Sequence, residues 1–194
     1  SREFMRGLAA LCRKRNLLLI TDEIQSGLGR TGTFFAFEAH GVKPDIVTMA
    51  KGLAGGLPLA ATLATERIAK LVKPGMHGST FGGNPVACAA SLEVFKILSP
   101  RALKSIRQTG LYLQRRLAEF RRFPSLKEIR CSGLMIGMEL NQSGDAYVNL
   151  ARERGLLINC TQGTVLRFLP PYFMKRSDLD RCLSILASVF ESLK

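Results

Sequence analysis

The sequence predicts an α/β fold, with a large domain over residues 1–98 and a small α+β domain over residues 99–194. In the first part, apolar strand-like runs alternate with helical patterns, which is typical of a mostly parallel sheet covered on both faces. Charged residues directly follow two of these runs, as they do at the ligand-binding edge of a parallel sheet. Short apolar runs and an amphipathic closing helix then indicate the separate α+β unit.

Each element of the first part has its own signal. Apolar residues recur at helical spacing over about residues 2–15, which predicts a helix. Apolar runs bounded by glycine, proline or charged residues predict strands. These strands are Leu17–Asp22, Ile46–Ala50 and Leu59–Thr65. A short helix is expected over residues 66–72, and Asn84 is expected to cap a further helix that begins at Pro85.

The second part begins with a helix from Pro100 to Arg122. Short apolar runs predict strands, and Gly133 reads as a bulge within the first pair of them. These strands are Ile129–Cys131, Leu134–Leu140, Leu156–Cys160 and Val165–Leu169. A helix is expected over residues 146–154. The closing helix is expected to begin at a Ser177 cap, with the apolar face Leu179, Leu183, Leu186, Val189 and Phe190 inward.

The composition excludes several classes of protein. The net charge is +13, but the basic residues are spread over several predicted helices and no aromatic-interleaved basic motif accompanies them. We therefore expect a solvated basic surface and no nucleic-acid partner. No uninterrupted apolar run is long enough for a membrane span, and no signal-peptide pattern opens the chain.

The cysteines and histidines point to a reducing compartment without a metal site. The five cysteines are an odd number and form no C-x-x-C pair, which favours reduced thiols and a cytoplasmic location. The two histidines have no metal-ligand neighbours at a useful spacing, so we expect no metal. Because the chain opens on Ser1 with a helix already under way, we expect it to be part of a longer protein.

Asp22 and Lys51 are the candidate chemical groups, because each directly follows a predicted strand. Pyridoxal phosphate enzymes need a lysine to hold the cofactor and a carboxylate to keep its pyridine nitrogen protonated. Taken alone, a lysine after a strand is more often solvated than catalytic. Glu23 adjoins Asp22 and must point the opposite way on an extended segment, so one carboxylate faces the ligand and the other makes a structural contact.

Three ordered motifs resemble the class III pyridoxal-phosphate aminotransferases. They are Leu19–Gly32, Pro44–Gly52 and Gly78–Pro85. The segments Leu157–Thr161 and Val165–Pro171 look most like the acetylornithine aminotransferase branch of that family. The resemblance implies part of a fold type I large domain, followed by the small C-terminal domain. It also implies pyridoxal 5'-phosphate as the cofactor.

The resemblance assigns roles around the cofactor ring. It implies that Lys51 forms the Schiff base with the cofactor and moves the substrate proton, that Asp22 pairs with the pyridine nitrogen, and that Gln25 binds the phenolic oxygen. A planar lysine-bound ring also needs space, and Gly52 and its small neighbours allow it. Lys51 and Asp22 are therefore the predicted catalytic residues.

The resemblance also assigns groups at the two ends of the site. Ser79 and Thr80 would bind the cofactor phosphate, with Thr80 reaching the cofactor of the neighbouring subunit in a homodimer. Arg167 would bind the substrate carboxylate through its planar fork. Without the resemblance, Thr80 reads equally as a turn-forming hydroxyl and Arg167 as a surface residue.

The implied reaction is transamination of N-acetylornithine with 2-oxoglutarate, a step of arginine biosynthesis. The resemblance leaves succinylornithine, ornithine and 4-aminobutyrate open as amino donors. The phosphate-binding turn and the ring-stacking aromatic of the family precede the segments found in this chain. The alternative to an enzyme is therefore a non-catalytic fragment that lacks the N-terminal cofactor-binding half.

Overall fold

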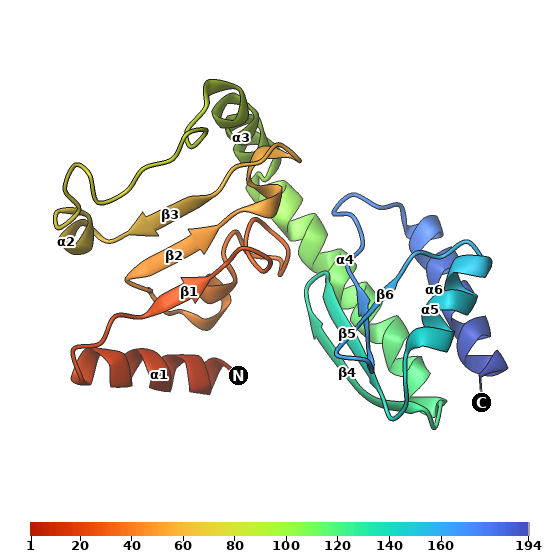
Figure 1. Ribbon diagram of the computed structural model, residues 1–194. Coiled ribbons are helices and arrows are strands. Elements are labelled where there is room, and N and C mark those ends of the chain that lie inside the picture. The colour runs from red at the N-terminus through yellow and green to blue at the C-terminus, as the bar shows by residue number, and fades with distance from the viewer. Residues whose placement is uncertain (194) are drawn as a thin grey trace. The chain divides into compact units, whose positions relative to one another are not determined.

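The computed structural model describes residues 1–193 (Figure 1). The chain divides into two compact units, one over Ser1–Lys104 and the second from Ser105 onward. This division falls within helix α4 (Pro100–Ala118), a few residues after the predicted boundary at residue 98. The assignment of a cofactor-binding domain and a small domain stays a prediction.

The first unit contains a three-stranded mixed sheet in the order β1-β2-β3. Its strands are β1 (Ile20–Asp22), β2 (Ile46–Met49) and β3 (Ala61–Ala64). β1 pairs with β2 in parallel, and β3 pairs with β2 in antiparallel. The ends of β1 and β2 that carry the candidate residues therefore lie at the same edge.

β1 is shorter than the sequence predicts, and Asp45 explains the difference. The carboxylate of Asp45 accepts a hydrogen bond from the Leu19 amide at 2.9 Å. The backbone amide of Asp45 donates to the Leu19 carbonyl at 2.8 Å. Both backbone groups of Leu19 are thus used by the residue that precedes β2, and the regular ladder begins one residue later.

Helices cover this sheet and carry the connections. They are α1 (Arg2–Lys14), η1 (Ala36–His40), η2 (Lys51–Ala54), α2 (Glu66–Ala69) and α3 (Pro85–Ile97). α1 buries Ala9 and Cys12 against Leu19, which forms a small core below β1. The predicted cap of α3 is confirmed, because Asn84 Oδ1 accepts a hydrogen bond from the Ala87 amide at 2.9 Å.

The second unit contains a four-stranded antiparallel sheet in the order β4-β5-β7-β6. The strands are β4 (Leu126–Ser132), β5 (Met135–Leu140), β6 (Asn159–Thr161) and β7 (Val165–Phe168). The predicted bulge at Gly133 is wrong. Gly133 has a φ of +58° and lies in the turn between β4 and β5, whereas the register shift falls between Leu126 and Glu128.

Helices pack on this sheet around a core that includes Ile106, Leu113, Ile136 and Met138. They are α4, η3 (Glu119–Arg122), α5 (Asp145–Glu153) and α6 (Arg176–Ser192). The five predicted apolar residues of α6 are all buried, as expected. The Ser177 cap is wrong, because the Lys175 carbonyl already accepts the amides of Asp178 and Leu179 at 3.1 Å, so Ser177 lies inside the first turn.

No helix within residues 1–193 is long and apolar enough to cross a membrane. The alternation of strands and helices in the first unit is the one expected from the sequence, and the second unit has the mixture of helices and strands expected of an α+β unit.

The close approach of α4 to the β4–β5 turn yields a stability prediction. A Cβ atom added at Gly110 would lie 2.8 Å from the backbone of Gly133. We expect Gly110→Ala to lower the free energy of unfolding by roughly 1–3 kcal/mol, because the helix must move away from the turn. Gly7 is the matched control, since a Cβ there meets nothing within 4 Å.

Gly7→Ala should raise the stability by about 1 kcal/mol through helix propensity alone. Urea unfolding followed by circular dichroism measures both changes. A Gly110→Ala variant as stable as the unchanged chain would contradict the packing described for α4.

A second prediction concerns pH. The Glu139 carboxylate accepts hydrogen bonds from Lys127 Nζ at 2.6 Å and from Arg130 at 2.5 Å, and these hold the pKa of Glu139 below its usual value. Its stabilising effect is therefore complete above the unfolded pKa of about 4.3 and is lost as the pH falls through the lower folded pKa. We expect Glu139→Gln to remove part of this acid destabilisation.

The three tyrosines all lie in the second unit and the chain has no tryptophan, so tyrosine fluorescence reports its unfolding. Glu153→Gln is the control, because Glu153 is exposed and has no ion pair within residues 1–193. Parallel stability–pH curves for Glu139→Gln and the unchanged chain would contradict the prediction.

Candidate active site

Asp22 ends β1, and two hydrogen bonds orient its carboxylate. Its Oδ1 atom accepts the Ile24 amide at 3.0 Å and the Thr48 hydroxyl of β2 at 3.1 Å. Its Oδ2 atom has no hydrogen-bond partner within residues 1–193. The side chain is exposed, so this oxygen is available to a ligand.

Glu23 turns the other way and is only 3% exposed. Its carboxylate accepts hydrogen bonds from the Ser26 hydroxyl at 2.8 Å and from the amides of Ala36 and Phe37 at 3.0 Å. Of the two adjacent carboxylates, Glu23 is thus the one that makes the structural contacts. The alternation of the strand alone left this choice open, and only the family resemblance favoured Asp22 as the cofactor partner. The donors at Ala36 and Phe37 are far away along the chain.

Lys51 follows β2 by two residues and begins η2. Its φ is +51°, in the left-handed region that non-glycine residues rarely adopt. Strained backbone of this kind is concentrated at functional sites. The side chain is exposed, and its ammonium has no ion pair within the described residues 1–193.

The structure brings Asp22, Gln25 and Lys51 to one edge of the sheet. Asp22 lies opposite Thr48 in the parallel register, and Lys51 lies three residues beyond Thr48. Gln25 lies in the turn directly after β1 and is half-buried. A carboxylate, an amide and an amine therefore lie on segments that leave the same edge of the sheet, and their roles toward a cofactor stay a prediction.

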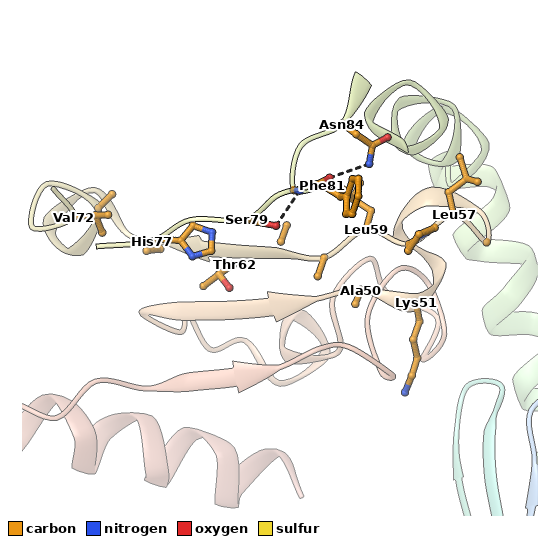
Figure 2. A pocket seen from close by; sticks show the side chains of 17 residues that line it. Ala50, Lys51, Leu57, Leu59, Thr62, Val72, His77, Ser79, Phe81 and Asn84 are labelled. Atoms are coloured by element: carbon orange, nitrogen blue, oxygen red, sulfur yellow. Dashed lines mark hydrogen bonds between the residues drawn. The ribbon is translucent and has the colours of Figure 1, made fainter. Parts of the chain in front are cut away.

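Ser79 and Thr80 belong to the loop 77–84, which the Lys51 side chain does not point toward (Figure 2). An open depression of about 1390 Å³ is lined by residues of the segment 56–64 and of the loop 77–84, with Lys51 at its border. Figure 2 shows the Lys51 side chain pointing away from the part of this loop that carries Ser79 and Phe81. Within one chain, the Ser79 hydroxyl therefore does not face the lysine ammonium (Figure 2).

The two loop hydroxyls differ in their contacts. Ser79 Oγ accepts the Gly82 amide at 2.9 Å and so closes the local turn. Thr80 is exposed, and its hydroxyl has no hydrogen bond within the described residues 1–193. The turn-forming role considered for Thr80 is thus performed by Ser79, and the Thr80 hydroxyl is available to a ligand.

Arg167 lies on β7 of the second unit, opposite Gly137 of β5 and Asn159 of β6. Its Nε donates to Asn159 Oδ1 at 3.2 Å, which restrains the guanidinium beside β6. Sequence reasoning did not single out Asn159 as a partner, although it lies within the motif segment Leu157–Thr161. Asn159 and Arg167 become neighbours only because β6 pairs with β7, and the sequence alone does not show this pairing.

A model of the family "Aminotransferase class-III" matches residues 1–190. The chain belongs to this family. It is 43% identical over 189 residues to an acetylornithine aminotransferase of Aquifex aeolicus, which covers 97% of this chain and 49% of that protein. An acetylornithine aminotransferase of Methanocaldococcus jannaschii is 43% identical over 195 residues, covering 100% of this chain and 49% of the relative. The chain spans about half the length of the curated relatives it matches.

Solved structures of aminotransferases have the same fold. An ornithine aminotransferase from Plasmodium yoelii superposes with a TM-score of 0.94 at 30% identity, covering 100% of this chain and 53% of that one. An acetylornithine aminotransferase from Elizabethkingia anophelis gives 0.91 at 30% identity, covering 99% of this chain and 52% of the other. The predicted family and fold class are therefore confirmed.

The left-handed backbone of Lys51 yields a prediction that is independent of activity. Glycine adopts a φ of +51° without the steric cost that an L-residue with a side chain meets there. We expect Lys51→Gly to exceed Lys51→Ala in free energy of unfolding by about 1 kcal/mol. Urea unfolding of the two variants measures the difference, and equal stabilities would show that no strain is stored at this position.

Proposed function

We propose that this chain carries the lysine-bearing part of a pyridoxal 5'-phosphate-dependent transferase that transaminates N-acetylornithine with 2-oxoglutarate, as in arginine biosynthesis. The observation that carries the proposal is the placement of Asp22 and Lys51 at adjacent ends of parallel strands. The names of the relatives from Aquifex aeolicus and Methanocaldococcus jannaschii support acetylornithine as the amino donor.

The residues present fit the cofactor chemically. Asp22 offers an oxygen without a hydrogen-bond partner within residues 1–193, which suits a protonated pyridine nitrogen. Lys51 offers an amino group without an ion pair in the same range, and Nζ would attach covalently in its neutral form. Gln25 offers an amide for the phenolic oxygen, and Gly52 leaves room beside the lysine.

When bound, pyridoxal phosphate withdraws electrons from the substrate Cα–H bond. The residues of this chain then divide the remaining work. Lys51 Nζ would accept the proton from the substrate Cα and deliver it to the C4′ carbon of the cofactor, and in the second half-reaction it would move a proton in the reverse direction. The Asp22 carboxylate keeps its partner nitrogen protonated. Arg167, oriented by Asn159, binds the substrate carboxylate with its remaining guanidinium nitrogens.

The proposal includes a second copy of the chain. The Lys51 side chain points away from the loop that carries Ser79, so Ser79 and Thr80 would bind the cofactor phosphate of a neighbouring subunit (Figure 2). Exposed apolar side chains around this loop support a homodimer: Met76 is 68%, Phe81 80% and Val86 69% exposed. A cytoplasmic location is proposed from the five free cysteines.

The amino donor has further candidates within the family. Ornithine is favoured as the runner-up, because an ornithine aminotransferase from Plasmodium yoelii has the same fold and one from Staphylococcus aureus is 41% identical. Succinylornithine and 4-aminobutyrate stay open. Because the chain spans about half of its relatives, a non-catalytic module is the second candidate function.

Covalent labelling tests the proposal. The chain is incubated with pyridoxal phosphate, reduced with borohydride and digested, and the labelled peptide is identified by mass spectrometry. We expect the label on Lys51, and its loss in Lys51→Ala, because Nζ is the attachment atom. Lys43→Ala is the control, since Lys43 is also exposed in the first unit but follows no strand.

Turnover of acetylornithine with 2-oxoglutarate should fall by at least about 10²-fold in Lys51→Ala and in Asp22→Ala. A folded chain that takes no label on Lys51 would support the non-catalytic module. Near-normal turnover in Asp22→Ala would exclude the role proposed for that carboxylate.

A further inference from the structure

We propose that Glu23 is a positioning residue of this site, which sets the orientation of Asp22 toward the cofactor. The inference deepens the proposed function and depends on it for the identity of the ligand. It starts from the burial of Glu23, whose side chain is 3% exposed although it adjoins the exposed Asp22. A buried carboxylate is costly unless hydrogen bonds compensate it, so its contacts need a reason.

The Glu23 side chain joins the turn after β1 to η1. Its Oε2 atom accepts the Ser26 hydroxyl at 2.8 Å and the Ala36 amide at 3.0 Å, and Oε1 accepts the Phe37 amide at 3.0 Å. Ser26 belongs to the turn after β1, whereas Ala36 and Phe37 begin η1. The carboxylate thus holds the active-site turn against η1.

The backbone of Glu23 ties the same point to β2 and to the turn. Its amide donates to the Thr48 carbonyl at 2.9 Å, and its carbonyl accepts the Gly27 amide at 3.0 Å. A Cβ atom at Gly27 would lie 2.8 Å from that carbonyl oxygen, so the turn is closely packed. The position of Glu23 is therefore determined from both its side chain and its backbone.

The two residues that donate hydrogen bonds to Asp22 are each linked to Glu23, one through the chain and the other through a backbone hydrogen bond. The Ile24 amide, which donates to Asp22 Oδ1, belongs to the residue directly after Glu23. The Thr48 hydroxyl donates to the same oxygen, and the Thr48 carbonyl accepts the Glu23 amide. A displacement of Glu23 must therefore change the two contacts that hold the Asp22 carboxylate.

The contacts also require a carboxylate of this length. All three partners of the Glu23 side chain donate hydrogen bonds, and an ionised carboxylate is acceptor-only. Glutamine has nearly the same shape but places an NH₂ group against at least one of these donors. Glu23→Gln therefore disturbs the hydrogen bonds with little change in volume.

Amide hydrogen exchange on the chain itself is the first test, because it needs no cofactor. We expect Glu23→Gln to speed exchange at Ala36 and Phe37 and also to speed exchange at Ile24 by about 10-fold. The Ile24 amide reports on Asp22, to which it donates. Faster exchange at Ala36 and Phe37 with an unchanged rate at Ile24 would overturn the proposal and leave Glu23 a local cap.

Glu38→Gln is the matched control. Glu38 is exposed and its Oε2 accepts the Phe35 amide at 3.3 Å in the same segment, so the variant removes a comparable charge without touching Asp22. It should leave the exchange of Ile24 unchanged. If Glu23→Gln does not fold, Ser26→Ala removes one of the three hydrogen bonds and should change the same amides in the same direction, by a smaller factor.

A double-mutant cycle on cofactor affinity is the second test, with pyridoxal phosphate as the probe. We expect Glu23→Gln to weaken binding about 10-fold in the unchanged chain and less than about 2-fold in the Asp22→Asn background, because coupled residues are not additive. Equal factors in both backgrounds would show that Glu23 does not act through Asp22. If the unchanged chain binds no pyridoxal phosphate, the proposed function fails, and the exchange test still decides the role of Glu23.

Discussion

The parallel pairing of β1 with β2, with Ile20 opposite Ile46 and Asp22 opposite Thr48, determines where the other candidate groups lie. Parallel strands end at the same edge, so the carboxylate that ends one strand and the lysine that follows the other leave the sheet at the same edge. The Thr48 hydroxyl reinforces this arrangement by donating to Asp22. A shift of one residue in this register would move Asp22 to the other face of the sheet.

Two residues at this edge carry a cost in free energy, the buried Glu23 and the left-handed Lys51, and the surrounding structure compensates only the first. The buried charge of Glu23 is surrounded by three hydrogen-bond donors. Lys51, with its left-handed backbone, begins η2 two residues after the end of β2. Within residues 1–193, no ion pair of its side chain offsets the cost of this conformation. Strain that is retained at the proposed attachment residue is consistent with a functional role for that conformation.

Local sequence signals predicted some features well because they depend on neighbouring residues alone. Asn84 caps α3, and the apolar face of α6 is buried. The signals failed where a backbone carbonyl, and not the expected side chain, begins a helix, and where a turn stands in place of an expected bulge. The Lys175 carbonyl begins α6 before Ser177, and Gly133 turns the chain between β4 and β5 instead of forming a bulge.

The sequence alone determined the family and the opposed directions of Asp22 and Glu23, and it predicted Asp22 and Lys51 as the chemical groups, because motif order and the alternation of strands are local properties. Only the tertiary structure showed what holds the buried carboxylate of Glu23, because the amides that donate to it come from η1, which follows a long turn. It also decided that the loop with Ser79 lies away from the Lys51 ammonium, since the path of the chain between them depends on packing (Figure 2).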